Sequence, residues 1–224
     1  MISKKINKIF LKVCIFCIFS LLSFGKTYEI YPTKNIHNQL QLNTVTGEIK
    51  QIQDDGQKWV ICEGIEKSGK KEGRFALYET KNMWNFLLLD TYTGKVWQSQ
   101  FSTKGEEYMS TLPIVFFELS NPSKNSNWKN RFELHQTSNM WNFILLDSCT
   151  GRLWQVQYTI QEDSFRGIVS INEEELAKES KENIFYITPL TSMYQYYLTN
   201  DKTGEIWKFQ WSTKGEDYRW IEKL

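Results

Sequence analysis

The sequence predicts an all-β fold of four tandem antiparallel units of three or four strands each, arranged as a small four-bladed β-propeller-like domain. The first observation is a repeat: the segments starting at Phe75 and Phe132 share the block Asn-Met-Trp-Asn-Phe, with weaker copies starting at Tyr28 and Phe185. The second is a Thr-Gly pair in every copy, with glycines at 47, 94, 151 and 204. Internal repeats of this length are typical of propellers and stacked arrays.

The first 25 residues are predicted to be a signal peptide. Four lysines fall within residues 1–12, and residues 13–24 carry no charge. A run of that length is shorter than the roughly 20 residues of a membrane-spanning helix, but it fits a secretory signal. With cleavage after Gly25, we expect an exported protein, periplasmic or extracellular, with no membrane span after cleavage.

Removal of this segment changes the charge balance. The whole chain has 27 basic and 26 acidic side chains, so loss of four lysines leaves 23 against 26, a net charge of −3. This balance argues against nucleic acid or an anionic membrane surface as a partner.

The mature chain contains two cysteines, Cys62 and Cys149. Export permits a disulfide between them, but they occupy different repeat positions, so their pairing is left open.

The unit that starts at Phe75 illustrates the strands expected in each copy. We predict strands at Phe75–Tyr78, Met83–Leu89, Lys95–Phe101 and Tyr108–Leu112. Asp90–Gly94 is the predicted turn, in which the aspartate caps backbone amides and the glycine adopts positive φ. Asn43, Asp147 and Asn200 stand at the position that matches Asp90.

The four units form a single predicted repeat domain over residues 26–224. Their expected limits are 27–63, 74–113, 131–171 and 184–224. Residues 172–182, with an acidic beginning, are predicted to form a short helix. A unit of about 50 residues has the size of a propeller blade and needs neighbours to cover its sheet. A β-sandwich or a stack of sheets is the alternative.

The stretch Asp-Thr-Tyr-Thr-Gly-Lys-Val-Trp, residues 90–97, resembles the repeat of quinoprotein-type (PQQ-like) β-propellers. Exported bacterial proteins of unassigned role contain similar units. The resemblance implies that the tryptophan after each Thr-Gly pair docks between neighbouring sheets, which concerns Trp97, Trp154 and Trp207. It transfers no cofactor-binding residue to this chain, and no cofactor is expected.

An aromatic or imidazole ring followed by an amide recurs where the second strand of each unit starts. The pairs are Trp84-Asn85, Trp141-Asn142, Tyr194-Gln195 and His37-Asn38. If the preceding loops converge, these rings can stack on sugar C–H groups while the amides bind hydroxyls. The alternative is that the rings pack in the core and the amides satisfy backbone groups.

Two further patterns recur at matched positions. Glutamines alternate along the third strand of the units, as Gln51, Gln98 and Gln155 with Lys208 in the fourth, and as Gln53, Gln100, Gln157 and Gln210. Because side chains alternate between faces, the spacing of two places both rows on one face, which is expected to face water or to line a channel. The phrase Ser-Thr-Lys-Gly-Glu, at 102–106 and 212–216, is expected to be a turn.

Nothing in the sequence assembles a catalytic or metal site. His37 and His135 stand at unmatched repeat positions, and no nucleophile motif or phosphate loop is present. We therefore expect an exported, non-catalytic binding protein whose ligand is a glycan or a small polar molecule. The alternatives are a scaffold that contacts another protein of the cell envelope and, less favoured, a hydrolase.

Overall fold

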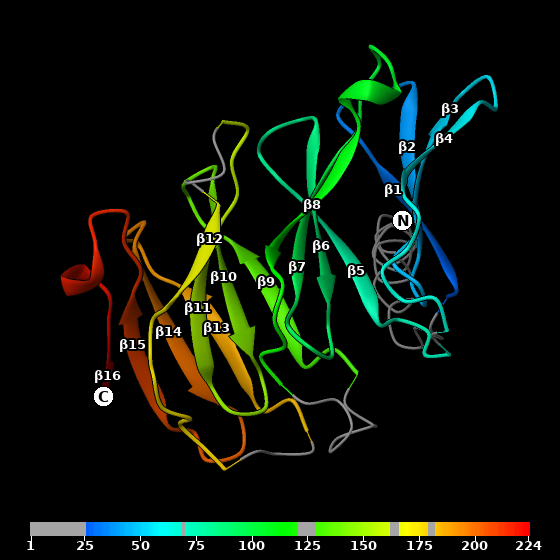
Figure 1. Cartoon of the computed structure of the whole chain (residues 1–224). Coiled ribbons are helices and arrows are strands. Elements are labelled where there is room, and N and C mark those ends of the chain that lie inside the picture. The colour runs from blue at the N-terminus through cyan, green and yellow to red at the C-terminus, as the bar shows by residue number, and fades with distance from the viewer. Residues whose placement is uncertain (1–25, 69, 121–128, 162–165, 179–181) are drawn as a thin grey trace, which may run out of the picture.

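A computed structural model describes residues 26–68, 70–120, 129–161, 166–178 and 182–224. The predicted signal peptide lies outside these residues. In the described part the chain forms four antiparallel sheets of four strands each (Figure 1). In each sheet the strands are named A, B, C and D in chain order.

Every sheet is a simple up-and-down meander, with the strands paired in the order of the sequence. The first sheet contains β1 (Tyr28–Pro32), β2 (Asn38–Asn43), β3 (Ile49–Gln53) and β4 (Lys58–Cys62). The second contains β5 (Phe75–Glu79), β6 (Asn85–Asp90), β7 (Val96–Gln100) and β8 (Ser110–Val115). The third contains β9 (Phe132–Gln136), β10 (Asn142–Asp147), β11 (Arg152–Gln157) and β12 (Gly167–Ser170). The fourth contains β13 (Phe185–Pro189), β14 (Gln195–Asn200), β15 (Ile206–Gln210) and β16 (Trp220–Lys223).

This architecture confirms the all-β, four-unit, propeller-like fold. In an up-and-down sheet the A–B and C–D connections share one edge, and the B–C turns share the other. We call the edge with the A–B and C–D connections the loop edge; it is uppermost in Figure 1. Two C–D connections of the loop edge contain a short 3₁₀ helix, η1 (Glu106–Tyr108) and η4 (Glu216–Tyr218).

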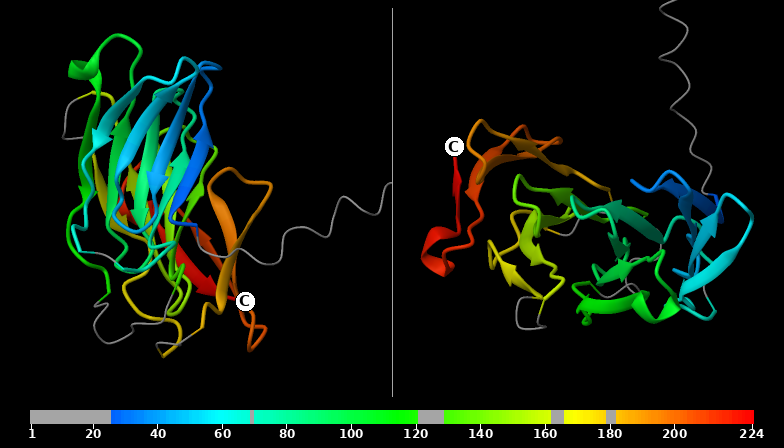
Figure 2. Two further views of the ribbon diagram at one scale, coloured as in Figure 1. Left: turned by 90° about the vertical axis from the view of Figure 1, so that its right-hand side faces the viewer. Right: turned by 90° about the horizontal axis from the view of Figure 1, so that it is seen from above.

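The four sheets stand face to face in chain order along an open arc (Figure 2). Strands A lie on the inner side of the arc and strands D on its outer side. The described core forms three clusters, and each joins two consecutive sheets. The first and fourth sheets therefore occupy the two ends of the arc.

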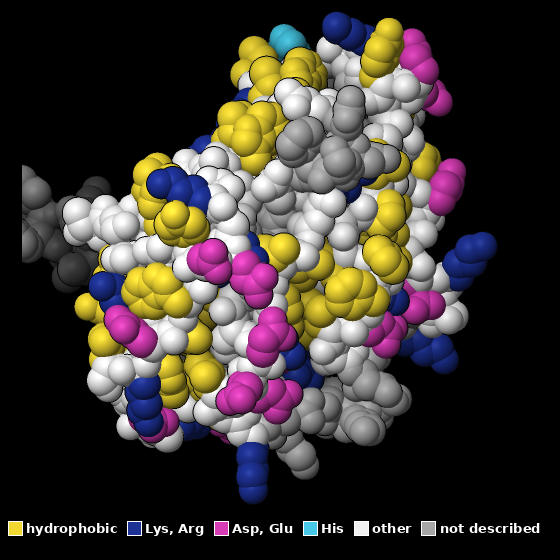
Figure 3. Space-filling model, turned by 60° about the vertical axis from the view of Figure 1, so that its left-hand side comes forward, with side chains coloured by type: hydrophobic (Ala, Val, Ile, Leu, Met, Phe, Trp, Pro, Cys, Tyr) yellow, Lys and Arg dark blue, Asp and Glu magenta, His cyan; other side chains and the backbone are white. Residues whose placement is uncertain are grey.

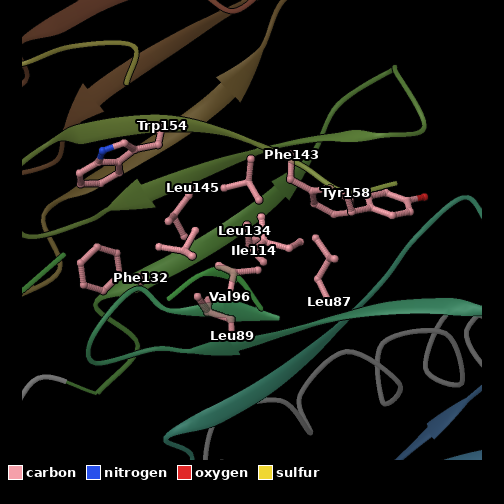
Figure 4. Packing of buried hydrophobic residues seen from close by; sticks show 12 residues of the cluster. Leu87, Leu89, Val96, Ile114, Phe132, Leu134, Phe143, Leu145, Trp154 and Tyr158 are labelled. Carbon is pink, nitrogen blue, oxygen red and sulfur yellow. The ribbon is translucent and has the colours of Figure 1, made fainter. Parts of the chain in front are cut away.

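The predicted docking of the tryptophans is confirmed. Trp97, Trp154 and Trp207 are all buried between sheets. Trp154 lies against Phe132 at a ring-centroid distance of 6.2 Å, among the leucines and valines contributed by the second and third sheets (Figure 4). The same pairing recurs for Trp97 with Phe75 and for Trp207 with Phe185.

The outward face of the first sheet carries polar residues at two positions that are hydrophobic in the second sheet. By the strand register, Lys50 stands where Trp97 stands in the second sheet, and Gln39 stands where Phe86 stands. Tyr28 and Ile30 on the same face are more than half exposed. Polar outer faces are typical of the terminal units of repeat arrays, because they need no covering neighbour.

The fourth sheet ends the arc in the same way. Thr199 replaces Leu89 on its outward face, and Lys208 replaces Gln98. The side of the molecule that includes this sheet shows small groups of hydrophobic side chains separated by acidic and basic ones (Figure 3).

The Thr-Gly turns form as predicted. Gly94 has φ +76°, and a Cβ atom there would lie 2.9 Å from Leu119 and 3.0 Å from the Phe132 ring. Asp90 accepts a hydrogen bond from the backbone N–H of Tyr92 at 3.0 Å. Asn43, Asp147 and Asn200 cap their turns in the same way.

The helix expected over 172–182 is wrong for its described part. Residues 172–178 form bends, because the backbone N–H groups of Leu176 and Ala177 donate to the carbonyl of Thr150 rather than along a helix. Both side chains pack against the core cluster of the third and fourth sheets. Residues 179–181 lie outside the described part of the chain.

Two further properties concern the described residues. Cys62 and Cys149 are buried in different units and are not joined by a disulfide. In the part of the chain that the structure describes, no helix has the length and hydropathy needed to cross a bilayer.

Candidate binding edge

The A–B loops, which carry the predicted site residues, lie side by side along the loop edge. Lys34 donates from Nζ to the carbonyl oxygen of Thr80 at 3.0 Å, and Lys81 does the same to Thr137 at 3.1 Å. Ser138 Oγ donates to the carbonyl of Met193 at 3.2 Å. These bonds join the four loops in a row that follows the arc.

The amides predicted to bind a ligand in the first three units are buried. Asn38, Asn85 and Asn142 are at most 2% exposed. Asn85 Nδ2 donates to Asn82 Oδ1 at 3.2 Å, and its Oδ1 accepts from Gln98 Nε2 at 2.8 Å. Because the amide is enclosed by these partners, the structure gives it a structural role.

Gln195 stands at the same position in the fourth unit and is half-buried. Its Nε2 donates to Gln210 Oε1 at 3.0 Å.

One of the two glutamine rows expected to face water or a channel instead links neighbouring sheets, namely Gln51, Gln98 and Gln155. The other row is half-buried: Gln53, Gln100, Gln157 and Gln210. Gln98 is 5% exposed. Its Oε1 accepts from the backbone N–H of Thr159 in the third unit at 3.3 Å, and its Nε2 donates to the Thr159 carbonyl at 2.7 Å. Gln51 and Gln155 accept in the same way from the backbone N–H groups of Ser102 and Ser212.

We call each such set of Asn, Gln and backbone groups an inter-sheet latch. The fourth unit has Lys208 at the glutamine position, and this side chain forms no latch with the described residues.

Loss of a latch glutamine should destabilise the fold. We expect Gln98→Ala to lower the free energy of unfolding by about 1–3 kcal/mol, because the Oδ1 of Asn85 and the backbone groups of Thr159 lose their hydrogen bonds to Gln98. Urea denaturation followed by circular dichroism measures this. Lys208→Ala, at the matched position without a latch, should change stability by no more than about 0.5 kcal/mol. Equal effects of the two substitutions would contradict the latch.

The rings predicted at the site are held by a second aromatic side chain. Trp84 packs on Phe101 with centroids 5.2 Å apart, Trp141 on Tyr158 at 5.3 Å, and Tyr194 on Trp211 at 5.1 Å. These rings are only partly buried, so each is both fixed in place and accessible at the loop edge.

The first unit replaces the aromatic pair with an ionisable one. His37 is exposed, and its Nδ1 lies 3.1 Å from Asp54 Oδ2. Hydrogen bonds from His37 and then Gln39 hold the pKa of the Asp54 carboxyl below its ordinary value.

A pocket of about 290 Å³ lies beside Trp84, between the A–B and C–D loops of the second unit. Its lining consists of Trp84, Gln100, Ser102, Thr103, Lys104 and Tyr108. Two aromatic rings therefore share a hollow with hydroxyl, amide and ammonium groups. A second, smaller pocket of about 120 Å³ lies beside Trp141 and is lined by Gln157, Tyr158, Thr159 and Gln161.

The phrase Ser-Thr-Lys-Gly-Glu contributes to two further pockets, which the sequence did not indicate. One pocket, of about 260 Å³, lies between the first and second sheets and includes Gln51 and residues 102–106. The other, of about 280 Å³, lies between the third and fourth sheets and includes Gln155, Ser212 and Thr213. The recurrence of this phrase beside matched glutamines was the signal that could have revealed these pockets.

The described residues contain no group of three His, Cys, Asp or Glu side chains that could hold a metal ion. His135 lies near the end of strand β9, and its Nε2 is 3.4 Å from Glu133 Oε2. The pockets along the loop edge bring together aromatic rings, amides, hydroxyls, cationic side chains and the carboxyl group of Glu106.

Comparisons with known proteins concern the fold. No protein-family model matches the chain, and no curated protein sequence matches it. The structure is similar to a 6-phosphogluconolactonase-like protein from Bacteroides uniformis, with a TM-score of 0.50 and 9% identity; the match covers 88% of this chain and 54% of that one. What they share is a propeller-like fold.

Two other solved structures are similar to a lesser degree. One is a 6-phosphogluconolactonase-like protein from Bacteroides fragilis, with a TM-score of 0.45 and 16% identity over 86% of this chain and 55% of that one. The other is an auxiliary nutrient binding protein from Bacteroides thetaiotaomicron, with a TM-score of 0.42 and 11% identity over 87% of this chain and 46% of that one. The chain thus spans about half the length of the structures it matches.

Proposed function

We propose that this chain is an exported, non-catalytic binding protein that recognises a saccharide at its loop edge. The observation that carries the proposal is the pocket between Trp84 and Tyr108. A sugar presents C–H groups to the faces of rings and hydroxyls to amides and cations, and this pocket offers both kinds of surface. The buried partner Phe101 fixes the Trp84 ring before a ligand arrives, which limits the entropy lost on binding.

The structure revises how such a ligand would be held. In the first three units the amides that follow the rings belong to the latches, so at the Trp84 pocket hydroxyl recognition passes to Gln100, Ser102 and Lys104. The row of A–B loops places the Trp84 and Trp141 pockets along one edge, an arrangement that suits an extended oligosaccharide rather than a single sugar.

Binding of four oligosaccharides tests the proposal. Cellohexaose, xylohexaose, chitohexaose and hexagalacturonate are titrated into the mature protein in a calorimeter. We expect saturable binding of at least one, and an affinity about tenfold lower for Trp84→Ala and for Tyr108→Ala, since tenfold corresponds to about 1.4 kcal/mol. Tyr108 is half exposed, so its loss tests binding even if Trp84→Ala weakens the fold.

Tyr28→Ala is the matched control, because Tyr28 is equally exposed but lies on the outward face of the first sheet. It should leave the affinity unchanged. Absence of binding to all four oligosaccharides, or equal losses in Tyr28→Ala and Tyr108→Ala, would contradict a saccharide site at the loop edge.

A second candidate function is contact with another protein of the cell envelope. Phe116 and Phe117 follow strand β8, are 74% and 47% exposed, and meet edge to face with centroids 5.6 Å apart. Exposed aromatic pairs of this kind are enriched in protein interfaces. If a single envelope protein co-purifies with the wild type but not with Phe116→Ser, this function is favoured over saccharide binding.

A further inference from the structure

The two inter-sheet pockets are built alike but differ in charge. Each combines two glutamines of one unit, one of which belongs to a latch, with residues of the Ser-Thr-Lys-Gly-Glu phrase of the next unit. By the sequence repeat, Met109 of the pocket between the first and second sheets corresponds to Arg219 of the pocket between the third and fourth. The second of these, which we call the arginine pocket, also includes Arg166.

A backbone hydrogen bond fixes the position of Arg219 beside the arginine pocket. It follows η4 directly, and its N–H donates to the carbonyl of Glu216 at 2.8 Å. Its side-chain Nε is buried and has no hydrogen-bond partner among the described residues. A buried donor on a cationic group is costly unless it finds an acceptor, so this nitrogen indicates a missing partner.

The lining of the arginine pocket favours an anionic partner. Its described lining consists of two arginines, two glutamines, hydroxyl side chains and small apolar groups, and it includes no Asp or Glu. Arg166 Nε contacts Gln98 Oε1 at 3.4 Å, which places this second guanidinium beside the latch of the second unit. Guanidinium groups bind oxyanions through short, charge-assisted hydrogen bonds.

We propose that the arginine pocket binds an oxyanion group, a carboxylate or a phosphate, through Arg219. Gln157 lines both this pocket and the neighbouring Trp141 pocket, so a ring bound at Trp141 could place an acidic substituent in the arginine pocket. This second step rests on the proposed saccharide function and specifies its ligand class: a saccharide that carries an acidic group.

Titration with sodium D-galacturonate, D-galactose and inorganic phosphate tests the inference, with binding followed by NMR of the ¹⁵N-labelled mature protein. We expect galacturonate to bind at least tenfold more tightly than galactose. Competition by phosphate would show that the oxyanion is recognised apart from the sugar, whereas galacturonate binding without phosphate binding would assign the pocket to carboxylates.

The decisive variant is Arg219→Met, which copies the residue of the twin pocket. It should weaken galacturonate or phosphate binding at least tenfold and leave galactose binding unchanged. Lys58→Met, which removes one exposed positive charge from the first sheet, should leave the affinities for galacturonate, phosphate and galactose unchanged. Equal binding of galacturonate and galactose by the wild type, or an unchanged galacturonate affinity in Arg219→Met, would overturn the inference.

The outcomes separate this inference from the proposed function. Oligosaccharide binding that depends on Trp84, together with galacturonate and phosphate binding that does not depend on Arg219, would support the saccharide site and overturn the oxyanion pocket. Oxyanion binding that depends on Arg219, without binding of any of the four oligosaccharides, would support the pocket and overturn the saccharide function.

Discussion

Replacement of Trp154 by alanine is expected to lower the free energy of unfolding by about 3–5 kcal/mol. Trp154 is 7% exposed and fills the space between the second and third sheets, against Phe132. The surrounding sheets are fixed by the latches and cannot close over the space, so a cavity remains. For a protein of this size the melting temperature should fall by about 10 °C, which calorimetry measures.

Trp220→Ala is the matched control, because Trp220 lies on the last strand and is only half-buried. Its loss should cost clearly less than that of Trp154. Equal melting temperatures of the two variants, or a melting temperature of Trp154→Ala equal to that of the wild type, would contradict the docking of the sheets by these tryptophans.

The second large effect is expected at the buried ion pair of the third unit. Arg131 and Asp147 are about 5% and 3% exposed at their side chains, and two hydrogen bonds of 2.9 and 2.6 Å join them. Asp147 also accepts from the backbone N–H of Cys149 at 3.0 Å. Arg131→Met leaves a buried carboxylate without its counter-ion and should cost about 3–5 kcal/mol in urea denaturation.

The fourth unit shows which neutral residues can replace this ion pair. There Ile184 and Asn200 occupy the positions of Arg131 and Asp147, so a neutral pair is compatible with the turn. The double variant Arg131→Ile with Asp147→Asn should recover most of the lost stability. A cost of less than about 1 kcal/mol for Arg131→Met, or a double variant no more stable than the single one, would contradict this account.

The sequence was sufficient to predict the strands because the same pattern occurs four times. The recurring features of the units are a run of hydrophobic residues, a capped turn with a glycine and a tryptophan after that turn. These are local features of the sequence, and their recurrence in several units shows that they are not accidental. The observed strand B of the second unit, Asn85–Asp90, differs from the expected Met83–Leu89 by two residues at its start. The expected fourth strand, Tyr108–Leu112, is observed at Ser110–Val115, because Tyr108 belongs to η1. The helix expected over 172–182 is wrong for its described part, because the N–H groups of Leu176 and Ala177 donate to the carbonyl of Thr150, which is distant in sequence.

The candidate site was harder to predict because burial of a polar side chain depends on the neighbouring sheet. The alternation of side chains along a strand predicted which face of the sheet carries Gln98. It did not predict the hydrogen bonds to Thr159 of the next unit, which bury this side chain. The fourth unit carries Lys208 at the matched position, where a glutamine stands in the other three units. The arginine pocket could not be predicted for a related reason. Its lining residues come from two units and come together only when the third and fourth sheets pack.

The most direct test of saccharide binding at the loop edge is ¹⁵N NMR of the tryptophan indoles during titration with the four oligosaccharides. Trp84 and Trp141 line loop-edge pockets, whereas Trp97, Trp154 and Trp207 are buried between sheets. We predict that at least one oligosaccharide shifts the indole signals of Trp84 and Trp141 and leaves the three docking tryptophans unchanged. If none of the four moves either loop-edge signal, the proposed saccharide site is wrong.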